Sequence, residues 1–311
     1  MVQQYRTTRK TQGRYEKTMK NILFYKYQTL KDLKDLKEHL LAEAKKRKLL
    51  GKVLIAKEGI NGCVSGEDKQ IEEYKKIITN IQGLEDIEFK EADTKHHNFK
   101  KIFVRIRQEI VTLKTNTKLE NKADYIEPQE LKELLAQEDV ILIDARNNYE
   151  SKIGRFKNAI CPDIEIFSDW PKAVKQLEHL KDKKIVTYCT GGIRCEKASA
   201  YLKEQGFNDV KQLHGGIIRY GQEVGDFAWE GKCFVFDKRG AINIDPKKNS
   251  EDITQCRQCG IPTSNYHNCV NVDCDKRVIL CEECIEVLEG CCDKRCRGKL
   301  RVFPQKRATP A

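Results

Sequence analysis

One stretch in the middle of the chain, residues 184–195 (KIVTYCTGGIRC), limits what the chain can fold into. Residues 185–188 are a short run of β-branched and aromatic side chains, which predicts a buried strand. The chain then passes Cys189 and two glycines, and residues 196–205 have helical composition. A cysteine between a strand end and a helix start lies where loop N–H groups and the positive helix end stabilise a thiolate. The pattern predicts that Cys189 is a nucleophile, with Arg194 supplying a fixed positive charge.

The Cys189 strand lies within an alternation of strands and helices. Residues 140–144 and 210–213 predict two further short strands, and strands separated by helices are typical of a parallel sheet covered on both faces. Ligands of such sheets bind at the carboxyl ends of the strands. Asp144, Cys189 and His214 all lie at predicted strand ends. We therefore expect one site built from three strands, in which Asp144 orients the cysteine loop.

The first part of the chain predicts a different architecture. Residues 21–115 have the order β-α-β-β-α-β, which is typical of a ferredoxin-like α+β domain. Within it, residues 59–62 (GING) are expected to form a turn. Basic side chains gather around the last strand, where they either contact phosphates of a substrate or form a solvated face. The candidate substrate-binding residues among them are Lys100, Lys101, Arg105 and Arg107.

Length and charge narrow the possible functions. The chain has 311 residues, which exceeds one ordinary hydrophobic core and predicts two or three domains. Its net charge of +11 suits a polyanionic partner, nucleic acid first, although a solvated lysine-rich surface would give the same excess. No apolar run approaches the roughly 20 residues that span a bilayer, and no secretory signal is recognisable. We expect a cytoplasmic protein without membrane contact, with basic tails at 1–20 and 299–311.

The third region is dominated by cysteine. Nine of the 14 cysteines lie between residues 256 and 296, in a segment too short and polar to form a core without another source of stability. Successive cysteine pairs present thiolates to tetrahedral zinc, and we expect two structural ions, with pair one joining pair three and pair two joining pair four. An iron–sulfur cluster is the alternative. His267 can take the place of one thiolate, and because nine cysteines and one histidine exceed the eight ligands of two ions, two residues of the region are left over. The candidate ligands are Cys256, Cys259, His267, Cys269, Cys274, Cys281, Cys284, Cys292 and Cys296.

The loop that follows the Cys189 strand is short. Four residues separate Cys189 from Arg194, one fewer than in cysteine-dependent protein phosphatases, and this favours a small sulfur adduct such as a persulfide over a phosphate. Three separated segments resemble the rhodanese family. They are the loop itself (CTGGIR), an upstream DAR followed by Glu150 and Gly154, and a later LHGGI. The resemblance covers residues 125–230. It makes the loop residues the expected anion-binding groups: Thr190, Gly191, Gly192 and Ile193.

Two side chains near this loop have open roles. Arg194 cradles the anion or pairs with a carboxylate such as Glu150, and the two roles are compatible. Cys195, at the start of the predicted helix, is a candidate resolving thiol that forms a transient disulfide with Cys189 or accepts sulfur from it. The alternative is that Cys195 is a small packed residue in the first helical turn.

The order of the three regions extends the resemblance to nearly the whole chain. A ferredoxin-like domain, a rhodanese domain and a cysteine-rich module in that order resemble the tRNA uridine(34) hydroxylase family, and residues 55–62 (IAKEGING) and 290–296 (GCCDKRC) are similar to segments of that family. The resemblance implies oxygen-dependent 5-hydroxylation of the wobble uridine of tRNA. It makes tRNA the partner, molecular oxygen the co-substrate and Cys189 the catalytic cysteine. No GxGxxG or P-loop fingerprint suggests a nucleotide cofactor.

Two other functions fit the same residues. A sulfurtransferase would pass persulfide sulfur from Cys189 to a thiol or to RNA, and a binding scaffold would use the rhodanese domain only as a fold. The presence of Cys189 argues against the scaffold. The expected arrangement is a basic tail at 1–20, a ferredoxin-like domain at 21–115, a linker at 116–124, a rhodanese domain at 125–230, a connector at 231–255, a zinc module at 256–298 and a basic tail at 299–311.

Overall fold

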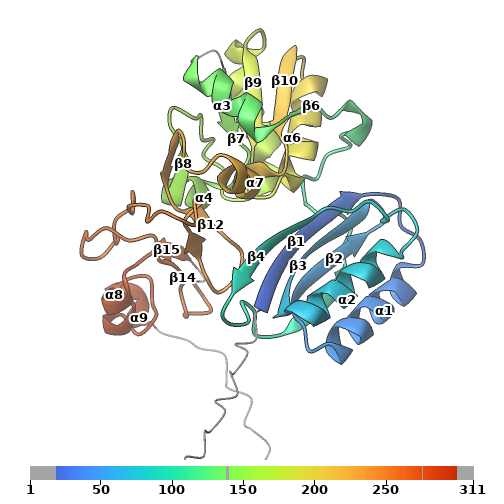
Figure 1. Cartoon of the computed structure of the whole chain (residues 1–311). Helices are drawn as coiled ribbons and strands as arrows, with labels where there is room; N and C mark the ends of the chain where they lie inside the picture. Colours follow the sequence, from blue (N-terminus) through green and yellow to red (C-terminus); the bar gives the residue numbers. More distant parts are fainter. Residues whose placement is uncertain (1–18, 138–139, 275, 300–311) are drawn as a thin grey trace, which may run out of the picture.

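The computed structural model describes residues 19–137, 140–274 and 276–299, so the predicted basic tails lie almost wholly outside the described residues. Within these ranges the chain forms an N-terminal domain, a central domain and a C-terminal module (Figure 1). The helix-free face of the N-terminal sheet is turned toward the central domain (Figure 1). None of the helices in the described ranges is long and apolar enough to cross a membrane.

The N-terminal domain consists of β1 (Met19–Tyr27), α1 (Leu33–Lys46), β2 (Leu50–Ala56), β3 (Gly59–Glu67), α2 (Asp68–Thr79), β4 (Phe89–Thr94) and β5 (Ile102–Ile106). Its sheet has the strand order β4-β1-β3-β2-β5. The first four of these strands are antiparallel neighbours and confirm the predicted ferredoxin-like order, while β5 adds a parallel edge strand beside β2. Helices α1 and α2 cover one face of the sheet (Figure 1).

The side chains of β1 alternate between two environments. Ile22 and Phe24 are fully buried in the core beneath α1 and α2, because residues two apart on a strand share a face. Leu23, Tyr25 and Tyr27 therefore lie on the opposite, helix-free face, where they are partly buried. The strand carries large side chains on both faces, so its second face is suited to packing against another domain.

The prediction of a turn at residues 59–62 is wrong. Strand β3 begins at Gly59, and the chain reverses at Lys57 and Glu58 instead. Gly59 has a φ of +150°, and a Cβ there would lie 2.1 Å from the carbonyl oxygen of Lys26 on β1. The glycine is required by close packing of two strands rather than by a turn, which is why the local glycine signal misled.

The central domain consists of the 3-10 helix η1 (Leu119–Asn121), β6 (Asp124–Ile126), α3 (Pro128–Ala136), β7 (Ile141–Asp144), α4 (Asn148–Ile153), β8 (Gly154–Phe156), η2 (Phe167–Asp169), α5 (Trp170–Val174), η3 (Lys175–Leu180), β9 (Lys184–Tyr188), α6 (Ile193–Glu204), β10 (Asp209–Leu213) and α7 (Gly216–Glu223). Strands β6, β10, β9 and β7 form a parallel sheet in that order. Apolar clusters lie on both faces of this sheet, with Ile185 in one and Val186 in the other. The predicted doubly covered parallel sheet is confirmed.

The C-terminal part has little regular structure. It contains β11 (Trp229–Gly231), β12 (Cys233–Phe234), β13 (Ala241–Ile242), β14 (Tyr266–Asn268), β15 (Arg277–Ile279), α8 (Glu282–Val287) and α9 (Lys294–Arg297). Residues 256–296 form a separate cluster made mostly of cysteines, with Val278, Leu280 and Leu288 as its buried aliphatic members, whereas Trp229 and Cys233 belong to the core of the central domain. So small an apolar core cannot balance the entropy of ordering the segment, and a further source of stability is needed.

Aromatic side chains join this module to the central domain. The ring of Tyr149 on α4 lies 5.2 Å from that of Tyr266 on β14 and 5.4 Å from that of Phe234 on β12, measured between centroids. The rings of Phe234 and Tyr266 are 5.0 Å apart. Such pairs contribute about 0.5–1.5 kcal/mol each beyond simple burial, so the three rings form a small hydrophobic joint between the two regions.

Candidate active site

Cys189 lies in the loop between β9 and α6, at the positive end of that helix. Its Sγ accepts a hydrogen bond from the backbone N–H of Gly192 at 3.2 Å, and the residue is only 1% exposed. Burial acts to raise the pKa of Cys189, but a hydrogen bond from Cys195, the charge of Arg194 and backbone N–H groups outweigh it and lower the pKa to about 6. The geometry expected of an activated thiolate is therefore present.

Cys195 lies in the first turn of α6 and is fully buried. Burial and its hydrogen bond to Cys189 both raise the pKa of the Cys195 thiol, so Cys195 keeps its proton while Cys189 ionises. The two sulfurs are close together, as a resolving role requires. That role stays a prediction, because a thiol that only stabilises the neighbouring anion has the same geometry.

Arg194 forms a buried ion pair with Glu150. Its Nη1 lies 2.5 Å from Oε1 and its Nη2 lies 2.8 Å from Oε2 of that carboxylate. Glu150 also accepts the backbone N–H of Asn147 at 3.1 Å, which closes a capping box at the start of α4. Of the two roles considered for Arg194, pairing with Glu150 is confirmed, and its charge still acts on the Cys189 thiolate.

Asp144 is buried at the end of β7, beside Tyr188 of β9, and in the described part of the chain no hydrogen bond joins its carboxylate to residues 189–194, so its orienting role stays a prediction. Both of its carboxylate oxygens accept hydrogen bonds from Arg146, the shortest being 2.6 Å to Nη2. Arg146 also donates to the carbonyl oxygen of Gly154 at 2.6 Å. A buried carboxylate requires such a charged partner, and the nearest arginine in the chain satisfies it. Asp144 thus positions Arg146, which in turn bonds to the start of β8.

His214, the third strand-end residue, is also directed away from the cysteine loop. Its Nδ1 lies 2.6 Å from Oε1 of Glu127, and its ring lies 4.6 Å from that of Tyr125. The turn after it does support the loop, since the backbone N–H of Ile217 donates to the carbonyl oxygen of Cys189 at 3.0 Å. The expected three-strand site is therefore reduced to the loop after β9 and its support from the start of α7.

The N-terminal domain covers the cysteine loop, which sequence reasoning missed. Gly192 has a φ of +99°, and a Cβ there would lie 2.7 Å from the hydroxyl oxygen of Tyr25, so a glycine is needed both for the backbone and for the contact. A Cβ at Gly191 would lie 2.7 Å from the side chain of Leu23. The hydroxyl of Tyr27 donates to a backbone carbonyl at the start of α6 at 3.2 Å. The alternation of large side chains along β1 was the one signal of this second interface.

Two charged residues in the first turns of α6 hold the domains together. The Nζ of Lys197 lies 2.9 Å from Oε1 of Glu58 and 2.6 Å from Oε2 of Glu109. Glu196 accepts a hydrogen bond from the Tyr25 hydroxyl at 3.3 Å. Lys197 and Glu196 are both buried, so their partners must be in place for the interface to form. Glu58 belongs to the IAKEGING segment, which thereby acquires a role in docking the two domains.

The four basic residues expected to bind substrate lie on or beside the edge strand β5. All are exposed, and no hydrogen bond or ion pair joins their side chains to the cysteine loop in the part of the chain that the structure describes. Their role in substrate binding stays a prediction. They are Lys100, Lys101, Arg105 and Arg107.

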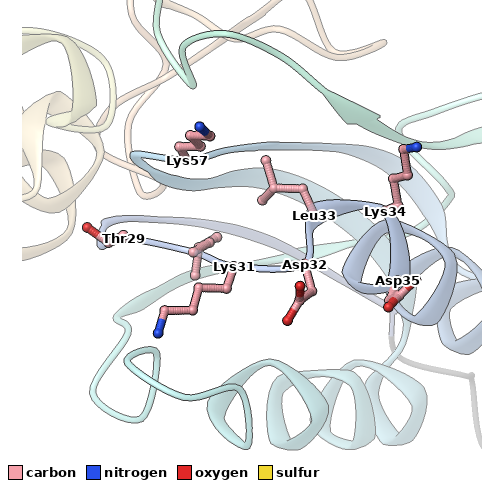
Figure 2. A pocket seen from close by; sticks show the side chains of 8 residues that line it. Thr29, Lys31, Asp32, Leu33, Lys34, Asp35 and Lys57 are labelled. Atoms are coloured by element: carbon pink, nitrogen blue, oxygen red, sulfur yellow. The ribbon is translucent and has the colours of Figure 1, made fainter.

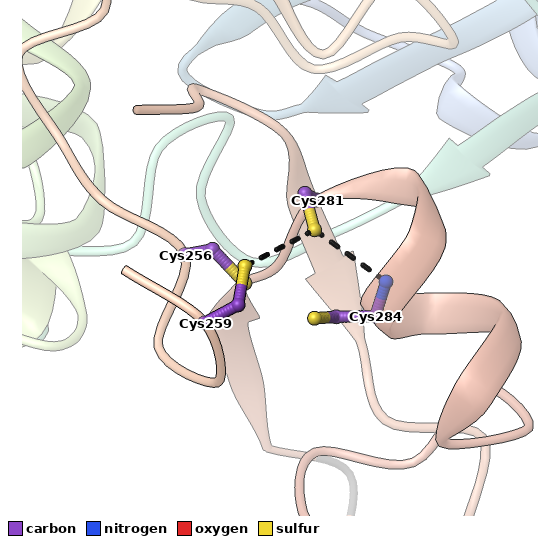
Figure 3. Close-up of side chains that lie close together, drawn as sticks. All are labelled: Cys256, Cys259, Cys281 and Cys284. Atoms are coloured by element: carbon purple, nitrogen blue, oxygen red, sulfur yellow. Dashed lines mark hydrogen bonds between the residues drawn. The ribbon is translucent and has the colours of Figure 1, made fainter. Parts of the chain in front are cut away.

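Eight cysteines of the C-terminal module form two groups of four. The sulfur atoms within each group all lie within 4.8 Å of one another. The pairing of the first cysteine pair with the third, drawn in Figure 3, and of the second with the fourth agrees with the expected interleaving. The groups are Cys256, Cys259, Cys281 and Cys284, and Cys269, Cys274, Cys292 and Cys296.

The sulfur separations fit a tetrahedral metal ion. The Sγ atoms of Cys259 and Cys281 are 3.7 Å apart, and those of Cys274 and Cys292 are 3.6 Å apart. A Zn–S bond of about 2.3 Å in tetrahedral geometry places two sulfurs about 3.8 Å apart. Each group therefore has the donor atoms and the spacing to hold one metal ion.

His267 belongs to neither group, and its predicted place among the metal ligands is wrong. Its Nε2 lies 2.8 Å from the carbonyl oxygen of Gly290, with which it makes a hydrogen bond. Four thiols already complete each group, so no imidazole is needed. Cys291 is the remaining cysteine of the region and is fully buried beside the second group. The two residues left over are thus His267 and Cys291.

Phe236 connects the module to the cysteine loop. Its ring centroid lies 5.7 Å from the guanidinium carbon of Arg194 and 5.0 Å from the ring of Phe234. Phe234 in turn packs on Tyr266 of the module. The side chain of Phe236 is 61% exposed on its other side. A chain of aromatic contacts therefore runs from the cysteine-rich module to the arginine beside Cys189.

A hollow in the N-terminal domain lies beside the start of α1. It is lined by residues 29–35 and Lys57 (Figure 2). Its lining mixes the charges of Lys31 and Lys34 with those of Asp32 and Asp35, and it contains no residue of the cysteine loop. The hollow therefore has no part in the site around Cys189.

Comparison with known proteins agrees with this arrangement of domains. The model of the UPF0176 acylphosphatase like domain matches residues 19–110, that of the rhodanese-like domain matches residues 127–223, and that of the rhodanase C-terminal region matches residues 230–297. The fold and the site thus define a rhodanese-type protein with an acylphosphatase-like N-terminal domain.

Curated relatives resemble the chain over nearly its whole length. A protein of Cytophaga hutchinsonii is 42% identical over 92% of this chain and 91% of its own, and one of Bacillus mycoides is 40% identical over 92% of this chain and 90% of its own. Both are named tRNA uridine(34) hydroxylase. The chain belongs to the tRNA uridine(34) hydroxylase family.

Proposed function

We propose that the protein hydroxylates C5 of the wobble uridine of tRNA, with molecular oxygen as co-substrate and the Cys189 thiolate as the group that engages the base. The observation that carries the proposal is the depressed pKa of Cys189, in a loop at the junction of two domains. Relatives 40–42% identical to the chain are named for this activity. The protein's net charge of +11 suits a tRNA partner.

The cysteine loop supplies both the nucleophile and the groups that hold it in place. The thiolate of Cys189 adds to C6 of a uracil base that has left its stack, and the electron pair of the C5–C6 double bond makes C5 nucleophilic. Dioxygen and an external two-electron reductant then place one oxygen atom on C5 and release the other as water. Loss of the C5 proton expels the thiolate and restores the double bond. Backbone N–H groups of the loop keep the sulfur ionised at neutral pH. The ion pair of Arg194 with Glu150 holds the loop in one geometry.

We infer that each group of four cysteines holds one structural Zn²⁺. The sulfur separations of 3.4–3.7 Å support tetrahedral coordination, and four thiolate ligands leave no open position for catalysis. The ions would supply the stability that the small apolar core of the module lacks. Metal analysis of the purified protein tests this: two zinc ions per chain are expected, and iron with sulfide would replace the assignment by iron–sulfur clusters.

The product identifies the reaction. Wobble nucleosides of tRNA from cells with and without the protein are compared by mass spectrometry, and loss of 5-hydroxyuridine derivatives is expected in its absence. Purified protein incubated with tRNA under isotopically labelled dioxygen should place the label in the base. A Cys189→Ser variant that still restores the modification would remove Cys189 from the mechanism.

A sulfurtransferase is the second candidate, because the same thiolate suits a persulfide. The short loop that ends at Arg194 favours a small sulfur adduct, and Cys195 lies where it can accept sulfur. Thiosulfate added to the protein would then leave one extra sulfur on Cys189 in intact-protein mass spectra. A thiolated base in place of the hydroxylated one would favour this function over hydroxylation.

A further inference from the structure

The helix-free face of the N-terminal sheet has a covered half and an open half. Strand β1 is covered by the cysteine loop, through Leu23 and Tyr25. Strands β2 and β5 lie farther along the same sheet (Figure 1), and there Lys52, Phe103 and Arg105 are exposed, with Phe103 at 40%. Between the two halves, Cys63 of β3 lies close to Asp237 and Arg239 of the connector, so the open half is the outer part of this face, on β2 and β5.

The register of the strands aligns side chains across this face. Lys90 of β4 pairs with Leu23 of β1, and Leu23 pairs with Cys63 of β3. Cys63 pairs with Lys52 of β2, and Lys52 pairs with Phe103 of β5. Directly paired residues lie on the same face of a sheet, so the five side chains form one row. With strands about 4.8 Å apart, the row is about 19 Å long.

The basic side chains of this face lack acidic partners. In the described part of the chain, no hydrogen bond or ion pair joins Lys52, Lys90 or Arg105 to a carboxylate, whereas Lys75 on the helix side pairs with Glu91. Burial lowers the pKa of Lys90, even though carboxylates act on it from a distance. Cations that are desolvated or clustered without a counter-charge are stabilised when an anion binds between them.

An aromatic ring lies among these cations. The guanidinium carbon of Arg105 lies 4.7 Å from the ring centroid of Phe103, and both side chains are exposed. Surfaces that bind single-stranded nucleic acid combine cations that follow the backbone with aromatic rings and arginine planes on which bases stack. The open half of the sheet combines these elements. An acidic peptide would pair with the cations but has no base to stack on the ring of Phe103.

We propose that the open surface defined by Lys52, Phe103 and Arg105, the RNA track, binds single-stranded RNA of the tRNA anticodon loop outside the reacting uridine. Lys52 and Arg105 contact phosphates, and Phe103 stacks on a base. The inference rests on the proposed function, since it takes tRNA as the substrate.

Binding of a fluorescein-labelled anticodon stem-loop RNA, followed by anisotropy across a range of KCl concentrations, tests the track. Lys52→Gln and Arg105→Gln should each weaken binding and reduce the salt slope by about 0.7–1, as expected for the loss of one phosphate contact. Phe103→Leu keeps an apolar side chain but removes stacking, so affinity should fall about tenfold at an unchanged salt slope. The matched control is Lys69→Gln, an exposed lysine of α2, which should bind as the wild type does.

The outcomes separate the track from the proposed function. Wild-type affinity and salt slope in both Lys52→Gln and Phe103→Leu, with RNA still bound by the wild type, would overturn the track and leave the proposed function in place. No binding of RNA by the wild type would overturn both. Equal competition by a polyaspartate peptide would overturn recognition of RNA in favour of a general anion surface. A second experiment places a photo-reactive residue at position 103 or at position 69 of the folded protein. A crosslink to RNA from position 103 and no crosslink from position 69 would support the track even if one of the substitutions above impairs folding.

Discussion

The cysteine loop and the C-terminal module are both built from buried cysteines, but different groups stabilise their sulfur atoms. In the loop, the thiolate of Cys189 is stabilised by the protein itself, through N–H groups, the Cys195 thiol and the charge of Arg194. In the module, sulfurs lie 3.4–3.7 Å from one another, and burial together with neighbouring thiols raises the pKa of Cys292. Four such thiols cannot ionise together without a cation between them.

The difference separates a reactive cysteine from structural ones. A single thiolate that is stabilised by fixed dipoles and one arginine is ionised near neutral pH and still free to form a bond. Thiolates that share a metal ion have their lone pairs engaged and contribute folding energy instead. Under the proposed function, the same side chain would serve catalysis in one region and stability in the other, according to which positive groups surround it.

Removing metal should have the largest effect, and only on the module. Zinc binding to such sites is worth about 10–16 kcal/mol in small domains, far more than the apolar core of the module supplies. Chelation under reducing conditions should release two ions per chain and abolish the hydrogen-exchange protection of residues 256–296, while residues 19–230 stay protected. A His267→Ala variant should retain both ions. Protected amides in a metal-free module would contradict the comparison.

Loss of the Cys189 sulfur should have the next largest effect, on activity rather than stability. A Cys189→Ser variant is expected to lose hydroxylation by about three orders of magnitude or more, because a nucleophile cannot be replaced by neighbouring groups. Its melting temperature should stay close to that of the wild type. The control is Cys161→Ser, a half-buried cysteine outside both the loop and the module. Equal loss of activity in both variants would show that the effect is not specific to Cys189.

The local features of both cysteine regions could be predicted from the sequence. The strand, loop and helix around Cys189 depend on side chains within about a dozen positions, and the spacing of the cysteine pairs sufficed to suggest two interleaved metal groups. The place of His267 was misjudged because spacing alone does not tell a ligand from a residue that bonds to a carbonyl, here that of Gly290. The ion pair of Asp144 with Arg146 was not predicted, because the sequence does not show which nearby charge a buried carboxylate takes as its partner.

Contacts between domains could not be predicted in this way. The hydroxyl of Tyr25 meets Glu196 across 171 positions, and Lys197 meets Glu58 across 139. No local pattern encodes such distances, and only the alternation of large side chains on β1 hinted at a second buried face. The glycine at position 59 shows the same limit, since its reason lies on a neighbouring strand.

Neutralising Glu150 should cost less than losing the metal or the nucleophile. A Glu150→Gln variant leaves the buried Arg194 without its counter-charge, and loss of one partner of a buried pair costs about 3–5 kcal/mol. Chemical denaturation should therefore report a destabilisation of about 3 kcal/mol in the central domain. The control, Glu178→Gln, removes the carboxylate of an exposed pair with Lys181 and should change stability by less than about 0.5 kcal/mol. Equal costs would mean that the pair of Arg194 is not effectively buried.

The Cys195 thiol should have the smallest effect, which appears as a change in pH dependence. With a pKa of about 6 for Cys189, its alkylation by iodoacetamide should rise with pH through that value and level off above neutrality. A Cys195→Ala variant loses a hydrogen bond to the thiolate, so the pKa of Cys189 should rise and the curve should move to higher pH. A rise of one unit would lower the thiolate fraction at pH 6 about fivefold. The Cys161→Ser variant should keep the wild-type curve. An unchanged curve in Cys195→Ala would show that backbone N–H groups and Arg194 suffice to ionise Cys189, and that the second thiol has a different task, such as resolving a sulfur adduct.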